Sequence, residues 1–300
     1  ASLAVLAIAP TMARDLADPS KYRLRGITGT ANSLGPLMAA GCMIALFMLK
    51  RAATTWKWRF HAFMLLVFFA TLLLTNSRSS IMGLVAAMFG SWLVAGQLGV
   101  LGLLVGLLGL AVLAIVMLYP GLQDALLSLL AGLFARSGNV AELTTFTGRQ
   151  QIWDASWRLA HEAPWIGHGL SSVSVVLPKA HADEWGNTVA TAHNFFLESL
   201  ISVGWLGTGL LLAVVLMALW ILARFLLSNK SCAPAATQSR DLAVCAFRCM
   251  IMMLVQGFGE KAFAGHPGSP FLALGAVVAT SIFIAREYLA SDLTRVQATP

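Results

Sequence analysis

One long polar segment, residues 120–194, interrupts a chain that is otherwise a succession of hydrophobic runs. The segment contains four basic side chains and four of the six histidines, namely Arg136, Arg149, Arg158, Lys179, His161, His168, His181 and His193. Arginine suits phosphate binding because its planar guanidinium can donate to two oxygens at once. Histidine suits proton abstraction from a hydroxyl group at neutral pH, because its ordinary pKa is about 6.5. We therefore predict that this segment carries the chemistry of the protein.

Two positions in the segment stand out by their place relative to predicted helices. Arg149 lies in the first turn of an amphipathic helix that opens with the capping-box spacing of Thr147 and Gln150. The helix macrodipole disfavours a cation there unless an anion binds, so Arg149 is a candidate anion ligand. His193 directly precedes Asn194, a favourable helix cap, at the start of the next hydrophobic run. The simpler alternatives are a solvated arginine and an ordinary histidine at the membrane boundary.

The amphipathic helix is predicted to present one mostly apolar face and to end in a turn. The residues of that face are Ile152, Trp153, Ser156, Trp157, Leu159 and Ala160. Tryptophan on such a face suits an interface between apolar and aqueous surroundings. Residues 164–169, with the sequence Pro-Trp-Ile-Gly-His-Gly, then end the helix and supply the turn.

The composition predicts a membrane protein, because 58% of the residues are hydrophobic and only 11% are charged. The apolar runs are roughly 17 to 25 residues long, enough to cross about 30 Å of hydrocarbon as helix. The predicted fold class is all-α: a polytopic helical membrane protein with about eight spans and one long, partly helical external loop. The predicted spans cover residues 1–12, 32–49, 60–75, 81–95, 99–119, 195–225, 242–263 and 271–285. The chain accordingly divides into transmembrane helices with short Arg-bearing connectors (1–119), a catalytic loop (120–194), and transmembrane helices with a cytoplasmic tail (195–300). Because the chain opens inside an apolar run, we expect that further helices precede it.

The positions of the basic residues indicate how the chain is oriented in the membrane rather than which partner it binds. The formal net charge is +7, but most Lys and Arg lie in short connectors, so we predict no nucleic-acid partner. The basic and aromatic connector 50–59 is typical of a cytoplasmic loop. Alternation then places four segments together on the outer face, namely 13–31, 76–80, 120–194 and 264–270.

The connector 13–31 breaks the charge rule, because it is predicted to be external yet is rich in Arg and Lys. Its Arg23 and Arg25 are therefore candidate functional residues, as is Arg78 in the short turn 76–80. Several arginines at the outer membrane boundary suit a diphosphate group whose lipid tail stays in the bilayer. Contact with ordinary anionic lipid headgroups is the alternative. The sequence shows no metal-ligand spacing and no nucleotide-binding fingerprint, so we predict chemistry without a metal or cofactor.

Short motifs across residues 20–210 resemble the bacterial O-antigen ligase and polymerase superfamily. In chain order these motifs are Arg23-Leu-Arg25-Gly26, Asn32-Ser-Leu-Gly35, Thr75-Asn-Ser-Arg78-Ser79-Ser80, Thr147-Gly148-Arg149-x-x-Ile152-Trp153, Pro164-Trp-Ile-Gly167-His-Gly169, and His193-Asn194-x-x-Leu197-Glu198 followed by Gly204-x-x-Gly207. The resemblance implies a multi-pass glycosyltransferase in the bacterial inner membrane with a periplasmic active site. Such an enzyme transfers a glycan from an undecaprenyl-diphosphate donor to an acceptor hydroxyl, here one of lipid A-core.

Carried onto this sequence, the resemblance makes His193 the base that activates the acceptor hydroxyl. Arg149 holds the diphosphate, together with Arg25, Arg23 and Arg78, and Arg158 is a further candidate. Members of the superfamily often carry a second histidine two residues before the first, where this chain has Thr191. They also usually have about ten or more spans, which exceeds the number predicted from the hydrophobic runs.

Three other activities stay open at this point. A polymerase that extends an O-antigen or exopolysaccharide on its carrier would use the same donor chemistry, as would a protein O-oligosaccharyltransferase. A transporter of lipid-linked glycans belongs to a different class, and it would place ionisable residues near the middle of the membrane on broken helices. In this chain the ionisable residues gather at one face of the predicted bundle, which favours an enzyme.

Overall fold

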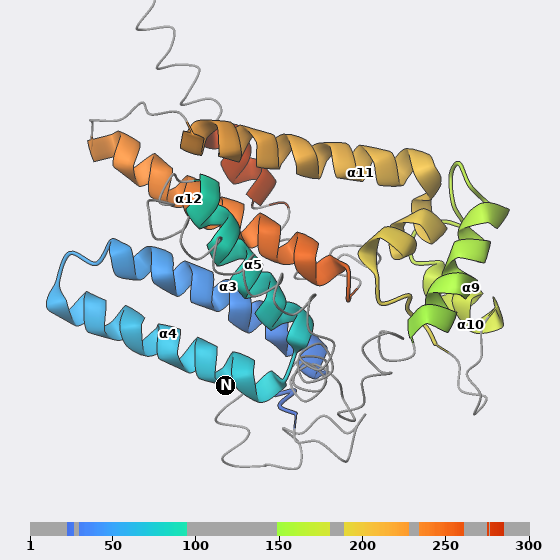
Figure 1. Cartoon of the computed structure of the whole chain (residues 1–300), viewed down its shortest axis with the longest axis horizontal. Helices are drawn as coiled ribbons and strands as arrows, with labels where there is room; N and C mark the ends of the chain where they lie inside the picture. Colours follow the sequence, from blue (N-terminus) through green and yellow to red (C-terminus); the bar gives the residue numbers. More distant parts are fainter. Residues whose placement is uncertain are drawn as a thin grey trace, which may run out of the picture. The chain divides into compact units, whose positions relative to one another are not determined.

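The computed structural model describes residues 23–26, 30–94, 149–180, 189–227, 234–260, 275 and 277–284. Within these ranges the elements of secondary structure are α-helices, as predicted. They are α3 (Ala31–Lys50), α4 (Thr55–Thr75), α5 (Arg78–Val94), α9 (Arg149–Glu162), α10 (Val173–Ala180), α11 (Phe195–Leu227) and α12 (Pro234–Gly257) (Figure 1). The predicted spans 1–12 and 99–119 lie outside the described residues.

Three of the described helices, α3, α4 and α11, are long and apolar enough to cross a membrane. Helix α5 is also apolar but shorter. Many large apolar side chains of α4 are exposed, which is the pattern of a helix that faces lipid rather than a protein core. The protein is therefore a helical membrane protein, and the total of about eight spans stays a prediction.

Side-chain caps and a left-handed residue set the ends of α3 and α4. Thr30 caps α3 by accepting a hydrogen bond from the Ser33 amide, and Thr54 caps α4 in the same manner. Helix α4 ends at Asn76, whose φ of 48° lies in the left-handed region that Asn tolerates. This reversal needs only Asn76 and Ser77, so Arg78 begins α5 rather than lying in a turn, as its sequence position had indicated.

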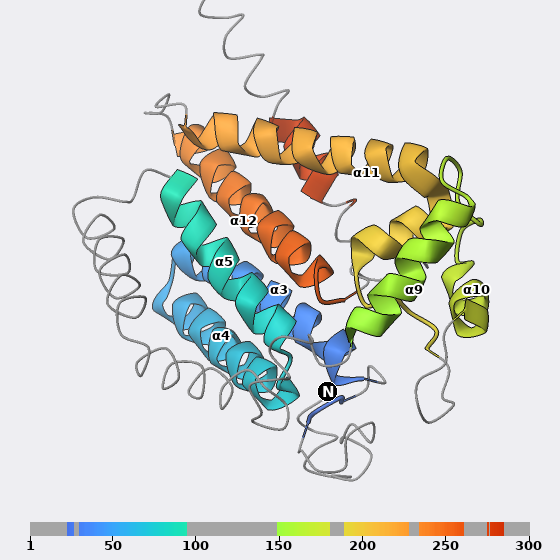
Figure 2. The ribbon, with the colours of Figure 1, turned by 45° about the vertical axis from the view of Figure 1, so that its right-hand side comes forward.

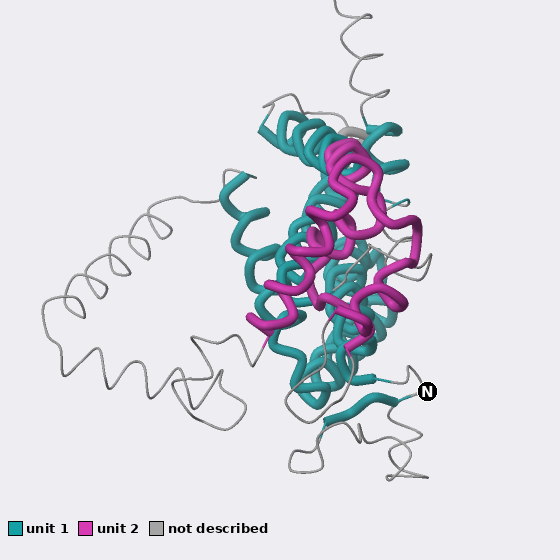
Figure 3. Tube along the Cα trace, turned by 90° about the vertical axis from the view of Figure 1, so that its right-hand side faces the viewer, with its two compact units in different colours: residues 1–94, 211–263, 267–300 teal, residues 95–210, 264–266 magenta. Residues whose placement is uncertain are grey.

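The chain packs into two compact units, and the division falls within α11 (Figure 3). Unit 1 comprises residues 1–94, 211–263 and 267–300, and unit 2 comprises 95–210 and 264–266. In unit 1, α3 packs against α4 and α12 packs against α5, while α3 also contacts α5 and α12 (Figure 2). The three-part division predicted from the sequence rests on membrane topology, which this division by packing does not address.

Polar contacts join the helix ends of unit 1 in two groups. At the start of α3, Asn32 accepts from the Arg23 guanidinium and donates to Glu260, just beyond α12. At the other end of α3, Lys50 forms an ion pair with the nearly buried Asp241 of α12. The start of α3 thus lies near the end of α12, and the end of α3 lies near the start of α12. The two helices are therefore antiparallel, as expected for an up-and-down bundle. Which group faces the periplasm stays a prediction.

Candidate active site

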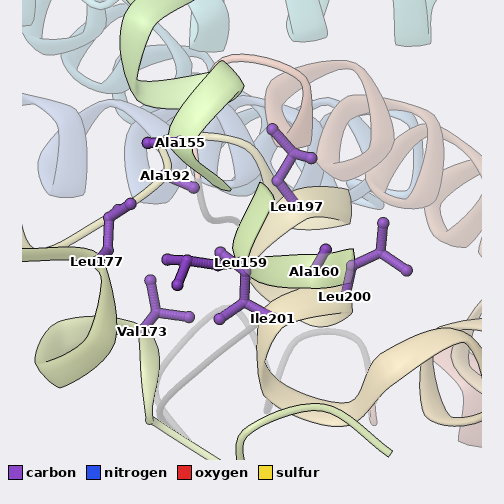
Figure 4. Packing of buried hydrophobic residues seen from close by; sticks show 9 residues of the cluster. All are labelled: Ala155, Leu159, Ala160, Val173, Leu177, Ala192, Leu197, Leu200 and Ile201. Atoms are coloured by element: carbon purple, nitrogen blue, oxygen red, sulfur yellow. The ribbon is translucent and has the colours of Figure 1, made fainter. Parts of the chain in front are cut away.

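Unit 2 is held together by a small apolar core between α9, α10 and the first part of α11. Its buried members are Ala155, Leu159, Ala160, Val173, Leu177, Ala192, Leu197, Leu200 and Ile201 (Figure 4). Four partly buried apolar residues pack around it, namely Ile152, Trp153, Val176 and Phe196. This core fixes the segment that leads into α11 against α9, and these two elements carry His193 and Arg149.

The predicted amphipathic face of α9 is confirmed with one exception. Positions 155, 156, 159 and 160 are buried, and Ile152 and Trp153 pack at the edge of the core. Trp157 is instead 43% exposed, and its ring makes edge contacts with His161 and Trp205. One residue turns about 100° around a helix axis, so a tryptophan directly after buried Ser156 lies at the margin of that face.

His193 occupies a backbone conformation that few side chains adopt. Its φ is 48°, in the left-handed region, and its side chain is partly buried. Asn194 follows as the predicted cap: its Oδ1 accepts from the amides of Phe196 (2.9 Å) and Leu197 (3.2 Å). The carbonyl of Asn194 accepts the first helical bond, from Glu198. The left-handed residue His193 therefore lies directly before the cap of α11, at the end of the helix where the macrodipole is positive.

One indole ties the segment before His193 to α9. The Nε1 of Trp153 donates to the carbonyl of Ala192 at 3.0 Å. Ala192 is fully buried, so without the indole its carbonyl would be left without this partner in an apolar setting. Trp153 therefore holds the backbone of Ala192, the residue before His193, against α9.

Replacing Trp153 by Phe is expected to lower stability by about 1 kcal/mol and to reduce activity through displacement of His193. The phenyl ring retains most of the apolar contact but has no N–H to donate. Thermal unfolding of the detergent-purified protein measures the first effect, and the transfer rate measures the second. Trp157→Phe is the matched control, because that ring lies at the exposed margin of the same helix. Equal effects of the two substitutions would show that the hydrogen bond to Ala192 has no special role.

The most unusual feature of unit 2 is a break in α11 at Gly204, where φ is 64° and ψ is −169°. In an unbroken helix, the amides of Trp205 and Leu206 would donate to the carbonyls of Ile201 and Ser202. Here those two amides donate to Pro164 (2.7 Å) and Trp165 (3.2 Å) of the turn after α9. The carbonyls that they leave accept instead from the amides of His168 (2.7 Å) and Gly169 (2.9 Å).

These two hydrogen bonds of α11 are thus replaced by four bonds to the turn 164–169, and each of the two amides and two carbonyls has a new partner. The sequence predicted a single span from 195 to 225, and the break divides it. The exchange requires close backbone contact at two glycines. A Cβ on Gly204 would lie 2.4 Å from the carbonyl carbon of Trp165, and one on Gly167 would lie 2.5 Å from that of Ser202. Both glycines also have positive φ.

His168 is a structural histidine in this arrangement. Its backbone amide donates to the Ile201 carbonyl at the break in α11, and its Nε2 lies 3.0 Å from the carbonyl of Leu159 in α9. It thereby links the end of α9 to α11 through side chain and backbone together. From the sequence alone, His168 could not be told apart from His193 among the histidines of the polar segment. The glycines on either side of His168 were the available signal of a backbone role, because glycine adopts positive φ.

The candidate arginines of unit 2 lie on different faces of α9. Arg149 is the first residue of α9, as predicted, and is partly buried, whereas Arg158 is exposed. Their separation along the helix is about 14 Å, with a rotation of about 180°. The two side chains therefore start from opposite faces of α9. Thr147 and Arg136 lie outside the described residues.

The remaining candidate arginines belong to unit 1. The Arg23 guanidinium donates to the carbonyl of Thr75 at 3.2 Å and to Asn32 Oδ1 at 2.5 Å. The Leu24 amide donates to the Leu74 carbonyl, so the segment runs along the end of α4, three residues before Arg78. The structure thus brings Arg23 to the α4–α5 turn, and Arg25, partly buried, is two residues further on. Three motifs that are separated in the sequence meet at this end of unit 1.

In the ranges that the structure describes, no group of three or more His, Cys, Asp or Glu side chains could hold a metal ion. The cysteines described there, Cys42, Cys245 and Cys249, are free and lie on the helices of unit 1.

Comparison with known families agrees with the motifs. Residues 63–212 match the family model described as O-antigen ligase, which covers half of the chain and includes α9, α10 and the break in α11. The chain therefore belongs to the O-antigen ligase family. No curated protein sequence matches it.

Proposed function

We propose that the protein is an O-antigen ligase-like glycosyltransferase that moves a glycan from undecaprenyl diphosphate to a hydroxyl of lipid A-core. The observation that carries this proposal is the placement of His193. A non-glycine residue held with positive φ beside a capped helix N-terminus is a constrained position of the kind that clusters at active sites. Family membership supports ligase or polymerase chemistry in general. The proposed setting is the bacterial inner membrane, with the site open to the periplasm.

In the proposed reaction, His193 accepts the proton of the acceptor hydroxyl as its oxygen attacks the anomeric carbon of the donor glycan. A bond forms between that oxygen and the anomeric carbon, and the bond from this carbon to the diphosphate oxygen breaks. The electron pair leaves with undecaprenyl diphosphate, whose added negative charge is stabilised by arginine. The reaction balances without an oxidant, a reductant or a nucleotide, and we propose that it needs no metal ion.

Arg149 is the leading candidate for the diphosphate ligand, because an anion there would meet both the guanidinium and the N-terminal amides of α9. Arg25, Arg23 and Arg78 form the second set of candidates at one end of unit 1. Arg158 is the least favoured, since helix geometry places it on the opposite face of α9 from Arg149.

Replacing Arg149 by Ala is expected to lower transfer by roughly 10²- to 10³-fold, the range seen when one donor to a developing negative charge is removed. Arg149→Lys should recover only part of the rate, because an ammonium group cannot donate to two oxygens in the fork geometry. The assay uses the protein reconstituted in vesicles with a lipid-diphosphate-linked glycan donor and lipid A-core acceptor, with and without EDTA. Arg158→Ala is the comparison on the same helix. Full activity of Arg149→Ala would remove Arg149 from the site.

The same assay separates the proposed ligase from its closest rival. Lengthening of the donor glycan without transfer to lipid A-core would assign the protein as a polymerase. Transfer to a protein Ser or Thr would assign it as an oligosaccharyltransferase. Movement of the donor across the vesicle membrane without any new glycosidic bond would favour a transporter. Loss of activity in EDTA would overturn the metal-independent mechanism.

A further inference from the structure

The two parts of α11 on either side of Gly204 differ sharply in burial. From Phe195 to Ser202, all but one residue is buried, including the polar Glu198, Ser199 and Ser202. Beyond Gly204, large apolar side chains become exposed at regular intervals, starting with Trp205 and Leu206 and continuing to Leu210 and Trp220. The first part is therefore buried like a helix inside a globular domain. The second part has exposed apolar side chains like those of a helix that faces lipid.

The lengths of the two parts agree with this division. Residues 205–227 extend about 35 Å at 1.5 Å per residue, which suffices for the roughly 30 Å hydrocarbon layer. Residues 195–203 add about 14 Å that a span does not need. The break at Gly204 thus separates the buried first part of α11 from a part long enough to span the bilayer, and Trp205, a residue favoured at membrane boundaries, directly follows the break.

The turn after α9 is joined to this same point of the helix. Trp165 and Ile166 are 67% and 76% exposed, although both are large and apolar. The carbonyl of Trp165 accepts from the amide of Leu206, and the Pro164 carbonyl accepts from that of Trp205. Backbone hydrogen bonds therefore hold the turn at the level of the first residues of the span, and the exposed side chains of both form one apolar surface.

From this geometry we propose that the turn Trp165–Ile166 inserts into the lipid bilayer beside the first turn of the membrane-spanning part of α11. Lipid covers this apolar surface, at the depth of the bilayer where headgroups meet acyl chains. Lipid is favoured because the surface is continuous with a helix whose length and exposed side chains suit a membrane, and because an aromatic and a branched aliphatic residue suit that depth.

Site-directed spin labelling of the full chain in lipid vesicles tests this proposal. Single cysteines are introduced as Ile166→Cys, Leu210→Cys and Ser174→Cys, in a background with the four native cysteines replaced by alanine. Leu210 is exposed on the spanning part of α11, and Ser174 is an exposed polar residue of α10 in the same unit. Collision of the label with oxygen, which is enriched in lipid, is compared with collision with a water-soluble nickel chelate.

The ratio of oxygen to nickel accessibility at Ile166→Cys is expected to be several-fold above that at Ser174→Cys and to approach that at Leu210→Cys. A ratio at residue 166 equal to that at residue 174 would overturn the proposal, as would water exposure at residue 210. Trp165→Cys provides the same measurement if Ile166→Cys fails to fold. Where the alanine background fails to fold, a genetically encoded spin label is placed at the same positions in the native chain.

Discussion

Replacing His193 by asparagine is expected to reduce glycan transfer by about 10²- to 10⁴-fold, the contribution typical of a positioned general base. Asparagine is chosen because it tolerates the left-handed conformation that His193 adopts, with φ of 48°. The substitution therefore removes the imidazole while it keeps the backbone that leads into α11. Steady-state rates with saturating donor and acceptor measure the effect on the chemical step.

Two further variants separate a chemical from a structural role. His193→Gly should be as inactive as His193→Asn, although glycine adopts positive φ without steric cost. His161→Ala, at an exposed histidine of α9 in the same unit, should retain full activity. Activity near the parent level in His193→Asn would eliminate His193 as the base. Unchanged unfolding temperatures in all three variants would show that the losses do not reflect misfolding.

Replacing Gly204 by alanine is expected to destabilise the protein by about 3 kcal/mol or more and to abolish activity. The new methyl group would meet the carbonyl carbon and oxygen of Trp165 at 2.4 Å, and both belong to backbone that is hydrogen-bonded to α11. The φ of 64° adds about 1–2 kcal/mol of strain for a residue with a Cβ. Relief of the contact requires the turn 164–169 to leave the helix, which would expose four backbone hydrogen bonds.

Gly209→Ala supplies the matched control within the same helix. A Cβ at Gly209 meets nothing within 4 Å, and its φ is not positive, so alanine there should be neutral or stabilising by up to about 1 kcal/mol. Thermal unfolding in detergent and limited proteolysis of the turn distinguish the two variants. An unfolding temperature of Gly204→Ala equal to that of Gly209→Ala would contradict the exchanged hydrogen bonds at the break.

Much of the fold could be predicted because hydrophobic runs and caps are local signals. The positions of α3, α4, α5 and α11 follow from runs of apolar residues long enough to cross lipid, and the cap at Asn194 follows from its side chain and its place before such a run. Arg149 at the start of α9 was predictable on the same grounds. The break in α11 was not, because Gly204 lies in an apolar run where glycine is common in membrane helices.

The amino-acid sequence alone identifies a helical membrane protein of the O-antigen ligase family, with His193 just before one helix and Arg149 at the start of another. These properties depend on side-chain chemistry and on spacing along one element. The three-dimensional fold was needed to show that the turn 164–169 completes hydrogen bonds of a broken α11, and that Trp153 holds the backbone next to His193. Those contacts join residues that are distant in the chain. Nearly every residue has the same backbone donor and acceptor, so the sequence does not indicate which partner a given backbone group will bind.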